Sequence, residues 1–553
     1  MKWEIPRLSG NALHTLLGLL DFGPLRRGFG HFLRKELGIE AARALPERLR
    51  GPLPLHVRPL QARRSHPRPS QDLPLPTSWN TLGAYAWIQA FRSKRTTPSL
   101  LVERVFDGIR ILAHHQPSMD PMLFVNTEEA RRDAEASTKR YAEGRPLGPL
   151  DGVPLPIKEE LDIEGRGATL GLKRPPNPSA RDATVVRWLR EGGAVVLGHS
   201  LMTEYGMSPL GVSAQRVLPR NAINPRHAAG GSSTGAAVAV ATRLVPVALG
   251  SDGGGSIRIP ASYNGLFGIK PTFGRISQTG SGFGGTMAQV GPIGLTTYDL
   301  AVFLEATSGE DPEDERTYGN PGFDRGWLVG ALRRGVRGLR IGVLEDEIDA
   351  AEAQVASACR DALRALESEG AKLIPVNLEF APHATAIGYM TIGLEAFAAL
   401  YELRQSAWED LGPDLRLLCR VMESFEADDY LDAQRLRAGL RREVAALLRE
   451  VDLLALPTTV RGAPPISDLE AKEGMADPKA LADASRFVYI ANLCGLPAGT
   501  APVGTDSQGL PVGLQFIADA WDEATVLQVM AHLERIGASQ APRPRVCFDT
   551  FEP

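Results

Sequence analysis

The sequence is poor in cysteine: its 553 residues contain only Cys359, Cys419, Cys494 and Cys547. No two of them form a CxxC pair, and the chain has neither an HExxH motif nor a zinc-like Cys/His spacing. These absences argue against a disulfide framework and against a metal or redox centre, and they are typical of reduced core thiols in a cytoplasmic protein. We therefore expect no metal and no cofactor.

Long apolar runs are also missing. The longest, 236–249, is interrupted by Arg243 and Pro246 and is shorter than the ~20 residues that a membrane-spanning helix needs. The first ten residues, MKWEIPRLSG, lack the basic and apolar regions of a signal peptide. A net charge of −4 gives no reason to expect nucleic acid as a partner. We expect a globular, cytoplasmic protein that associates with membranes peripherally at most.

The N-terminus differs from the rest of the chain. Apolar residues at helical spacing in 13–20 and again in 29–37 predict two helices, separated at Gly23-Pro24. Eight prolines between Pro46 and Pro76 indicate an extended arm, so we divide the chain into an N-terminal part, 1–77, and a main domain, 78–553. The helices either pack on the main domain or on a second subunit, or form a membrane-contacting surface with the basic residues at 26–35.

From residue 99 onward, predicted helices alternate with short β-rich runs. The helices are expected at 99–113, 128–143, 183–191 and 351–370 and within 388–449, and the strands at 152–157, 194–198, 340–344, 372–376 and 451–456. Such alternation predicts an α/β fold with a large, mostly buried central sheet.

Two serines stand in separate glycine-rich loops, Ser232 in GGSSTG and Ser256 in SDGGGSIR, 24 residues apart. Three glycines before Ser256 allow a tight turn that can direct consecutive backbone N–H groups at a developing oxyanion. The alternative is an ordinary glycine-rich turn. Asp252 and Arg258 flank this loop and either pair to hold its shape or are unrelated surface charges.

Ser233 and Thr234 begin an Ala/Val-rich run, where we expect them to cap a helix. Ser233 also occupies the centre of a G-x-S-x-G motif, but neither His383 nor His532 lies in a loop suited to complete a triad, so we reject a nucleophile elbow.

Lys158 follows the apolar run GVPLPI. A buried lysine loses its proton more readily and can act as a base. The alternatives are a surface lysine or a salt bridge to an acid at position 159, 160 or 162.

These motifs resemble the amidase signature family. The matching segments are GGSSTG, GSDGGGSIRIPASYNGLFGIKPTFGRIS, DGVPLPIKEELDIEG and NLCGLPAGTAPVGTDSQGLPVGLQF, and they extend over roughly residues 80–540. Within the family, AFRSKRTTP, EASTKRYAEG and TGSGFGGT are most similar to plant-type fatty acid amide hydrolases and their bacterial relatives. The resemblance implies a large mixed sheet covered by helices, with an N-terminal helical extension before the catalytic domain, 78–553.

The resemblance also implies roles for individual residues. Ser256 is expected to be the nucleophile, Ser232 the proton relay after a cis Gly231–Ser232 peptide, and Lys158 the terminal base. The remaining assignments are an oxyanion hole formed by the N–H groups of Gly253, Gly254, Gly255 and Ser256, and supporting roles for Ser233, Asp252 and Arg258.

The activity implied by the resemblance is cleavage of carboxylic amides to acid and amine through an acyl-enzyme. The expected substrates are small, lipid-like acyl amides such as N-acylethanolamines, and the expected partners are a second copy in a homodimer and a membrane surface. Short, aryl or carbamate substrates remain open. So do a transamidating subunit of a glutamyl-tRNA amidotransferase and a catalytically inactive scaffold.

Overall fold

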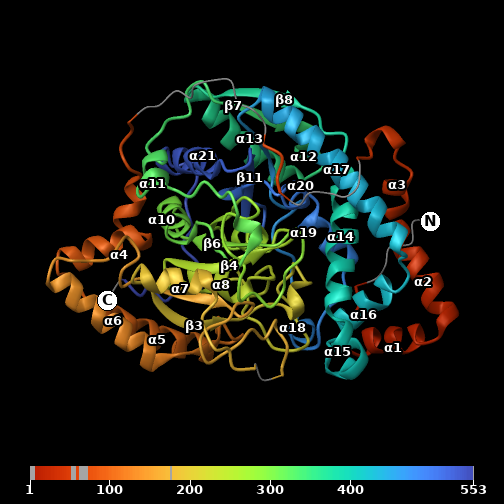
Figure 1. The fold of residues 1–553 in the computed structure, drawn as a ribbon, viewed down its shortest axis with the longest axis horizontal. Helices are drawn as coiled ribbons and strands as arrows, with labels where there is room; N and C mark the ends of the chain where they lie inside the picture. Colours follow the sequence, from red (N-terminus) through yellow and green to blue (C-terminus); the bar gives the residue numbers. More distant parts are fainter. Residues whose placement is uncertain (1–6, 52–57, 62–71, 175–176, 552–553) are drawn as a thin grey trace.

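The computed structural model describes residues 7–51, 58–61, 72–174 and 177–551, and a mixed eleven-stranded sheet runs through its centre (Figure 1). The strand order is β1-β3-β2-β4-β6-β5-β10-β11-β9-β7-β8. The strands are β1 (Met122–Val125), β2 (Pro154–Lys158), β3 (Val195–Ser200), β4 (Val247–Asp252), β5 (Phe267–Lys270), β6 (Gln289–Gly294), β7 (Arg340–Leu344), β8 (Lys372–Val376), β9 (Leu453–Pro457), β10 (Ala498–Thr505) and β11 (Pro511–Ala518). The predicted α/β class with a large central sheet is confirmed.

Strand direction places the site. β2 runs parallel to both β3 and β4, whereas β4 pairs antiparallel with β6. Ile157 of β2 lies opposite Leu249 of β4. Because the two strands run in the same direction, their last residues, Lys158 and Asp252, lie at the same edge of the sheet.

Helices cover the sheet and extend beyond it at both ends (Figure 1). After the N-terminal helices they are α4 (Gly83–Arg92), α5 (Pro98–His114), α6 (Thr127–Ala142), α7 (Thr184–Glu191), α8 (Thr234–Ala241), α9 (Arg258–Tyr263), α10 (Thr297–Thr307), α11 (Trp327–Ala331), α12 (Glu345–Asp349), α13 (Ala353–Ser368), α14 (Ala384–Ala399), α15 (Tyr401–Ser406), α16 (Pro413–Met422), α17 (Ala427–Glu450), α18 (Asp468–Glu473), α19 (Pro478–Ser485), α20 (Tyr489–Cys494) and α21 (Glu523–Arg535).

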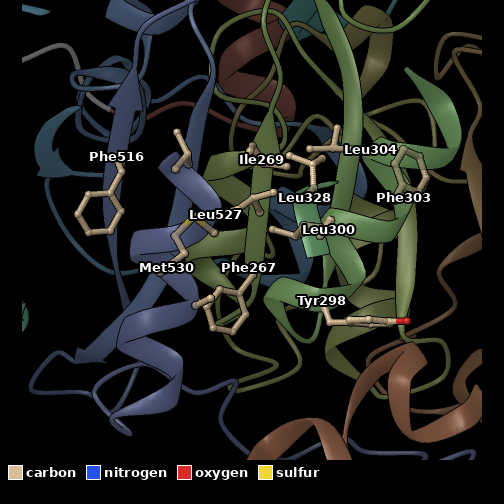
Figure 2. Close-up of a cluster of buried hydrophobic side chains, with 14 of the residues drawn as sticks. Phe267, Ile269, Tyr298, Leu300, Phe303, Leu304, Leu328, Phe516, Leu527 and Met530 are labelled. Carbon is tan, nitrogen blue, oxygen red and sulfur yellow. The ribbon is translucent and has the colours of Figure 1, made fainter. Parts of the chain in front are cut away.

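The main core lies where α10 and α21 meet the sheet (Figure 2). Helix α10 begins with a capping box between Thr296 and Asp299, which satisfies backbone N–H groups at the buried start of the helix. A side chain at Gly499 of β10 would come within 2.4 Å of Met530 Sδ, so this glycine allows α21 to approach the sheet closely.

Helix α8 is apolar all round, and every one of its residues is buried. Such a helix belongs inside a protein rather than on its surface. It contacts β2, β3 and β4. The helix therefore fixes the segment before it, which carries Ser232 and Ser233, against the edge where β2 and β4 end.

The N-terminal helices are α1 (Gly10–Leu20), α2 (Gly23–Glu36) and α3 (Ile39–Arg43), with the predicted break at Gly23-Pro24. They pack on α14 and α16 of the main domain (Figure 1, red beside cyan). Two of the basic residues bind acids there: Arg26 pairs with Glu423 at 2.9 Å, and Arg34 pairs with Asp429 at 3.1 Å. Among the described helices, none is long and apolar enough to cross a membrane. Much of the predicted proline-rich arm, 46–76, lies outside the described residues.

Candidate active site

Lys158 ends β2 with its side chain 1% exposed. Its Nζ donates hydrogen bonds to Ser232 Oγ at 2.8 Å and to Ser251 Oγ at 2.6 Å. Nζ also lies 3.0 Å from Glu160 Oε2. Of the alternatives raised by the sequence, a surface lysine is wrong: the residue is buried, contacts the predicted relay serine and forms a salt bridge with one of the three nearby acids.

The segment before α8 brings two serines to different partners. The Gly231–Ser232 peptide is cis, as the family resemblance implies. Ser233 makes no helix-capping hydrogen bond, so that prediction is wrong. Its hydroxyl donates to Ser251 O at 3.1 Å and accepts from Ser251 N at 3.2 Å, which ties the start of α8 to β4. The other predicted cap, Thr234, donates its hydroxyl to Gly230 O at 2.8 Å.

Ser256 lies on the loop between β4 and α9, half-buried, and its hydroxyl forms no hydrogen bond with another described residue. The N–H of Ser233 donates to Ser256 O at 3.3 Å, so the two serine loops are in direct contact. Gly255 has φ +105°, a conformation that favours glycine. Its N–H donates to Asp252 Oδ1 at 2.7 Å, whereas those of Gly253 and Gly254 form no hydrogen bond within the described chain.

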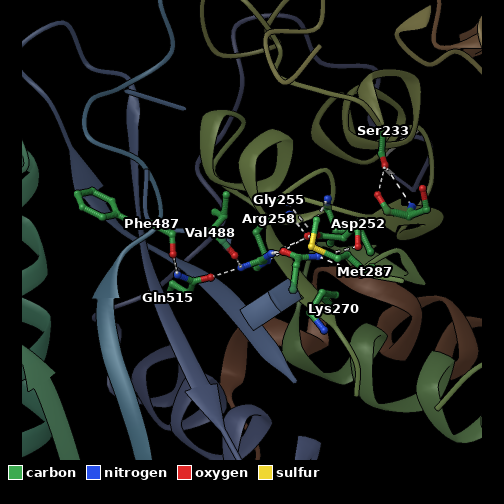
Figure 3. A network of polar contacts seen from close by, with 12 residues as sticks. Ser233, Asp252, Gly255, Arg258, Lys270, Met287, Phe487, Val488 and Gln515 are labelled. Carbon is green, nitrogen blue, oxygen red and sulfur yellow. Dashed lines mark hydrogen bonds and ion pairs between the residues drawn. The ribbon is translucent and has the colours of Figure 1, made fainter. Parts of the chain in front are cut away.

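Asp252 and Arg258 form a fully buried ion pair behind this loop (Figure 3). Two guanidinium nitrogens of Arg258 each lie 2.9 Å from a different oxygen of Asp252. Burial alone would raise the pKa of Asp252, but the charge and hydrogen bonds of Arg258, with a hydrogen bond from Asn492, hold it well below its usual range. The predicted pairing is present, and unrelated surface charges are excluded.

Arg258 has three further partners. It donates to Val488 O at 2.9 Å, to Asn492 Oδ1 at 2.5 Å and to Gln515 Oε1. Asn492 also donates to Asp252 O at 2.9 Å. The loop that carries Ser256 is therefore held by residues from α20 and β11, far away in the sequence.

Lys270, at the end of β5, lies close to this ion pair (Figure 3). Burial, and then the positive charge of Arg258, lower its pKa to about 7, against the opposing effect of Asp252. Its Nζ donates to the carbonyl of its own neighbour, Pro271 O, at 2.7 Å. This lysine is a second buried amine near the site, but its hydrogen bond is directed away from both glycine-rich loops.

A cavity of about 600 Å³ adjoins the catalytic cluster, with Leu170, Leu172, Tyr205 and Leu403 in its wall. Tyr205 precedes Gly206, where a Cβ would lie 3.4 Å from Ser232 Oγ. Tyr205 also meets the ring of Phe283 edge-on, with centroids 5.6 Å apart. The cavity therefore has an apolar wall directly beside Ser232.

Sequence reasoning did not assign Ser251, Asn492 and Gln515, and it gave Glu160 only as one of three alternative partners of Lys158. Ser251 and Glu160 stand beside motif residues, so proximity in sequence was a usable signal for them. Asn492 and Gln515 reach the site only through the fold. The described ranges contain no group of three or more His, Cys, Asp or Glu side chains arranged to hold a metal ion.

Comparisons with known proteins agree with this geometry. A family model described as amidase matches residues 105–527. A fatty acid amide hydrolase of Oryza sativa subsp. indica is 32% identical over 83% of this chain and 77% of its own. The glutamyl-tRNA(Gln) amidotransferase of Chloroflexus aurantiacus has a subunit, its first, that is 34% identical over 78% of this chain and 92% of its own. A solved structure concerned with the evolutionary origins of an s-triazine catabolic enzyme is 29% identical, with a TM-score of 0.76, and covers 83% of this chain and 100% of its own.

Proposed function

The chain belongs to the amidase family and is a hydrolase of amides, and from that premise we propose that it cleaves acyl amides with a long apolar acyl chain through an acyl-enzyme on Ser256. The observation that carries the proposal is the buried hydrogen bond between Lys158 Nζ and Ser232 Oγ, 2.8 Å long, beside the loop of Ser256. A nucleophilic hydroxyl needs a base within reach, and this contact supplies one through a relay.

In the proposed reaction, Lys158 accepts the proton of Ser232 as Ser232 accepts that of Ser256. Ser256 Oγ forms a bond to the amide carbonyl carbon. The proton returns through Ser232 to the leaving nitrogen as the C–N bond breaks, and the amine departs. Water then repeats the cycle on the acyl-enzyme and releases the acid.

The N–H groups of Gly253 and Gly254 support the predicted oxyanion hole, because neither is used within the described chain. Backbone donors of this kind stabilise the charge that develops on the carbonyl oxygen. The N–H of Gly255 serves the loop instead, since it already donates to Asp252. We therefore assign the oxyanion to the first two glycines together with the N–H of Ser256.

The apolar surroundings of Tyr205 support a long acyl chain. Tyr205 and Leu172 belong to a buried apolar cluster with Leu400. Phe397 and Leu418 pack both on this cluster and on a second one that contains Leu33 of α2. Apolar side chains thus continue from the cavity beside Ser232 toward the N-terminal helices, which is what an acyl chain needs for binding.

The corner between α1 and α2 supports contact with a lipid surface. Leu19, Phe22 and Leu25 are 52%, 62% and 49% exposed there. Binding to phosphatidylcholine vesicles in a flotation assay, lost in Phe22→Asp, is the expected result. Loss of a dimer in Phe22→Asp, measured by light scattering, would instead assign this corner to the predicted second copy.

The test of the proposed function is a chain-length series of acyl p-nitroanilides on the purified chain, with fluorophosphonate labelling. We expect kcat/KM to rise with acyl length, and both labelling and turnover to be lost in Ser256→Ala. A preference for acetyl substrates would contradict the apolar acyl chain but leave the amidase chemistry intact. Turnover only with added partner proteins would favour a component of an amidotransferase, the alternative suggested by the Chloroflexus relative.

A further inference from the structure

The amine of Lys158 has three partners from three different parts of the chain. They are Ser232 before α8, Ser251 in β4 and Glu160 in the turn after β2, at 2.8, 2.6 and 3.0 Å. A protonated lysine has three N–H donors, so each hydrogen has one acceptor. Only Ser232 among these partners has an assigned role in the reaction.

Glu160 is held from both sides. Its Oε2 accepts a hydrogen bond of 2.5 Å from Ser251 Oγ, and its Oε1 accepts one of 3.3 Å from Ser281 Oγ. Its backbone carbonyl accepts from Gly282 N at 2.8 Å. The side chain is 5% exposed, so its carboxylate faces Lys158 in a setting with little water. A buried carboxylate this close to an amine strongly favours the charged form of that amine.

The other ionisable groups around Lys158 have partners elsewhere. Glu159 pairs with Arg216 at 2.7 Å, and Asp252 pairs with Arg258. His199 of β3 contacts Leu161 O at 2.8 Å, and burial lowers its pKa to about 4, so it is neutral at ordinary pH. Glu160 is therefore the carboxylate that acts on the amine among the described residues.

We propose that Glu160 is a positioning residue for Lys158: it holds the amine toward Ser232 and sets the pH at which the amine becomes free to accept a proton. This inference rests on the proposed function, in which Lys158 is the base. Glu160 neither gains nor loses a proton in the cycle. Its carboxylate stabilises the ammonium that forms when Lys158 accepts the proton passed from Ser232, as the buried aspartate does for histidine in Ser-His-Asp enzymes.

The test is the pH profile of kcat/KM for Glu160→Gln in the full chain, with an acyl p-nitroanilide as substrate. Glutamine keeps the size and the hydrogen bond to Ser251 but removes the charge. We expect the acidic limb to move to lower pH by about one to three units, and the maximal kcat to fall because the ammonium is less stabilised. A merely structural role would lower kcat without moving the limb.

Glu159→Gln is the matched control, because Glu159 is an equally buried neighbour whose partner is Arg216 rather than Lys158. Its acidic limb should stay at the pH of the wild type. An unmoved limb in a folded Glu160→Gln protein overturns the proposal. If that variant does not fold, Glu160→Asp withdraws the carboxylate by one methylene, and the limb must still move to lower pH; an unmoved limb there overturns the proposal too.

Failure of the proposed function would look different. If Lys158→Met or Ser256→Ala retained turnover, the assigned base or nucleophile would be wrong whatever Glu160 does. If both were inactive and Glu160→Gln kept the wild-type profile, only the role of Glu160 would be wrong.

Discussion

Two buried polar clusters lie on either side of the Ser256 loop, and they differ in what their hydrogen atoms can do. The base cluster consists of Lys158, Glu160, Ser232 and Ser251, joined through an amine and hydroxyl groups. The arginine cluster consists of Asp252, Arg258, Asn492 and Gln515, in which a guanidinium is locked to a carboxylate and two amides (Figure 3). Amines and hydroxyls exchange protons readily, whereas an arginine does not lose its proton in proteins.

The comparison separates two tasks that one loop needs. The base cluster can pass a proton but has few long-range anchors. The arginine cluster cannot pass a proton, but it fixes Asp252, which in turn accepts from Gly255 N and orients the glycine turn. Changes in the first cluster should therefore affect turnover, and changes in the second should affect stability first.

The largest effect is expected from Ser232→Ala in the base cluster. It removes the proposed relay, so kcat should fall by about 10²–10⁴-fold while the thermal midpoint changes little. Ser233→Ala is the matched control, because that hydroxyl contacts only the backbone of Ser251 and should cost stability, about 1 kcal/mol, rather than chemistry. The measurements are p-nitroanilide kinetics and thermal melts. A larger loss of turnover in Ser233→Ala would reverse the assignment of the two serines.

Arg258→Met in the arginine cluster should give the opposite pattern. It leaves Asp252 charged, buried and without its cation, which costs about 3–5 kcal/mol of stability. Turnover per folded molecule should fall as well, because the glycine turn loses its support. Urea unfolding followed by tryptophan fluorescence measures the first effect, and the double variant Arg258→Met/Asp252→Asn should recover part of the lost stability. Wild-type stability in Arg258→Met would remove the distinction between the clusters.

The sequence predicted the fold elements better than their arrangement. Strands β7 and β8 have the predicted bounds, 340–344 and 372–376, because short β-branched runs between polar segments are clear local signals. The pairing of β5 with β10 joins segments more than two hundred residues apart, and no local pattern specifies it. Strand order therefore became known only with the structure.

The same limit applies to the site. Lys158 and Ser232 could be identified because each stands in a recognisable motif. The acid that pairs with Lys158 could not be chosen among positions 159, 160 and 162, since the choice depends on which way each side chain leaves the end of β2. Asn492 is 240 residues away from Asp252, and only the packing of α20 brings it to the loop.

A smaller effect should separate the clusters by pH. Lys270 lies beside the arginine cluster with its pKa lowered by burial to about 7, against an ordinary value of 10.5. Unfolding therefore takes up a proton between these two values, and stability should rise with pH across that window. Wild type should gain roughly 2 kcal/mol over Lys270→Met between pH 7 and 9, measured by urea unfolding. A parallel stability profile in the two proteins would show that Lys270 is charged in the fold throughout.

The smallest effect is expected where the two clusters meet, at Gly254. A Cβ there would lie 2.6 Å from Cε1 of Tyr489, whose ring is already against Gly388 and cannot retreat. Gly254→Ala should therefore displace the loop slightly, lowering kcat/KM roughly tenfold and stability by about 1 kcal/mol. Gly284→Ala is the matched control, since a Cβ at Gly284 has no heavy atom within 4 Å. The double variant Gly254→Ala/Tyr489→Leu frees the space and should recover turnover. If it does not, the loop is held by the arginine cluster alone and not by the fit of its glycines.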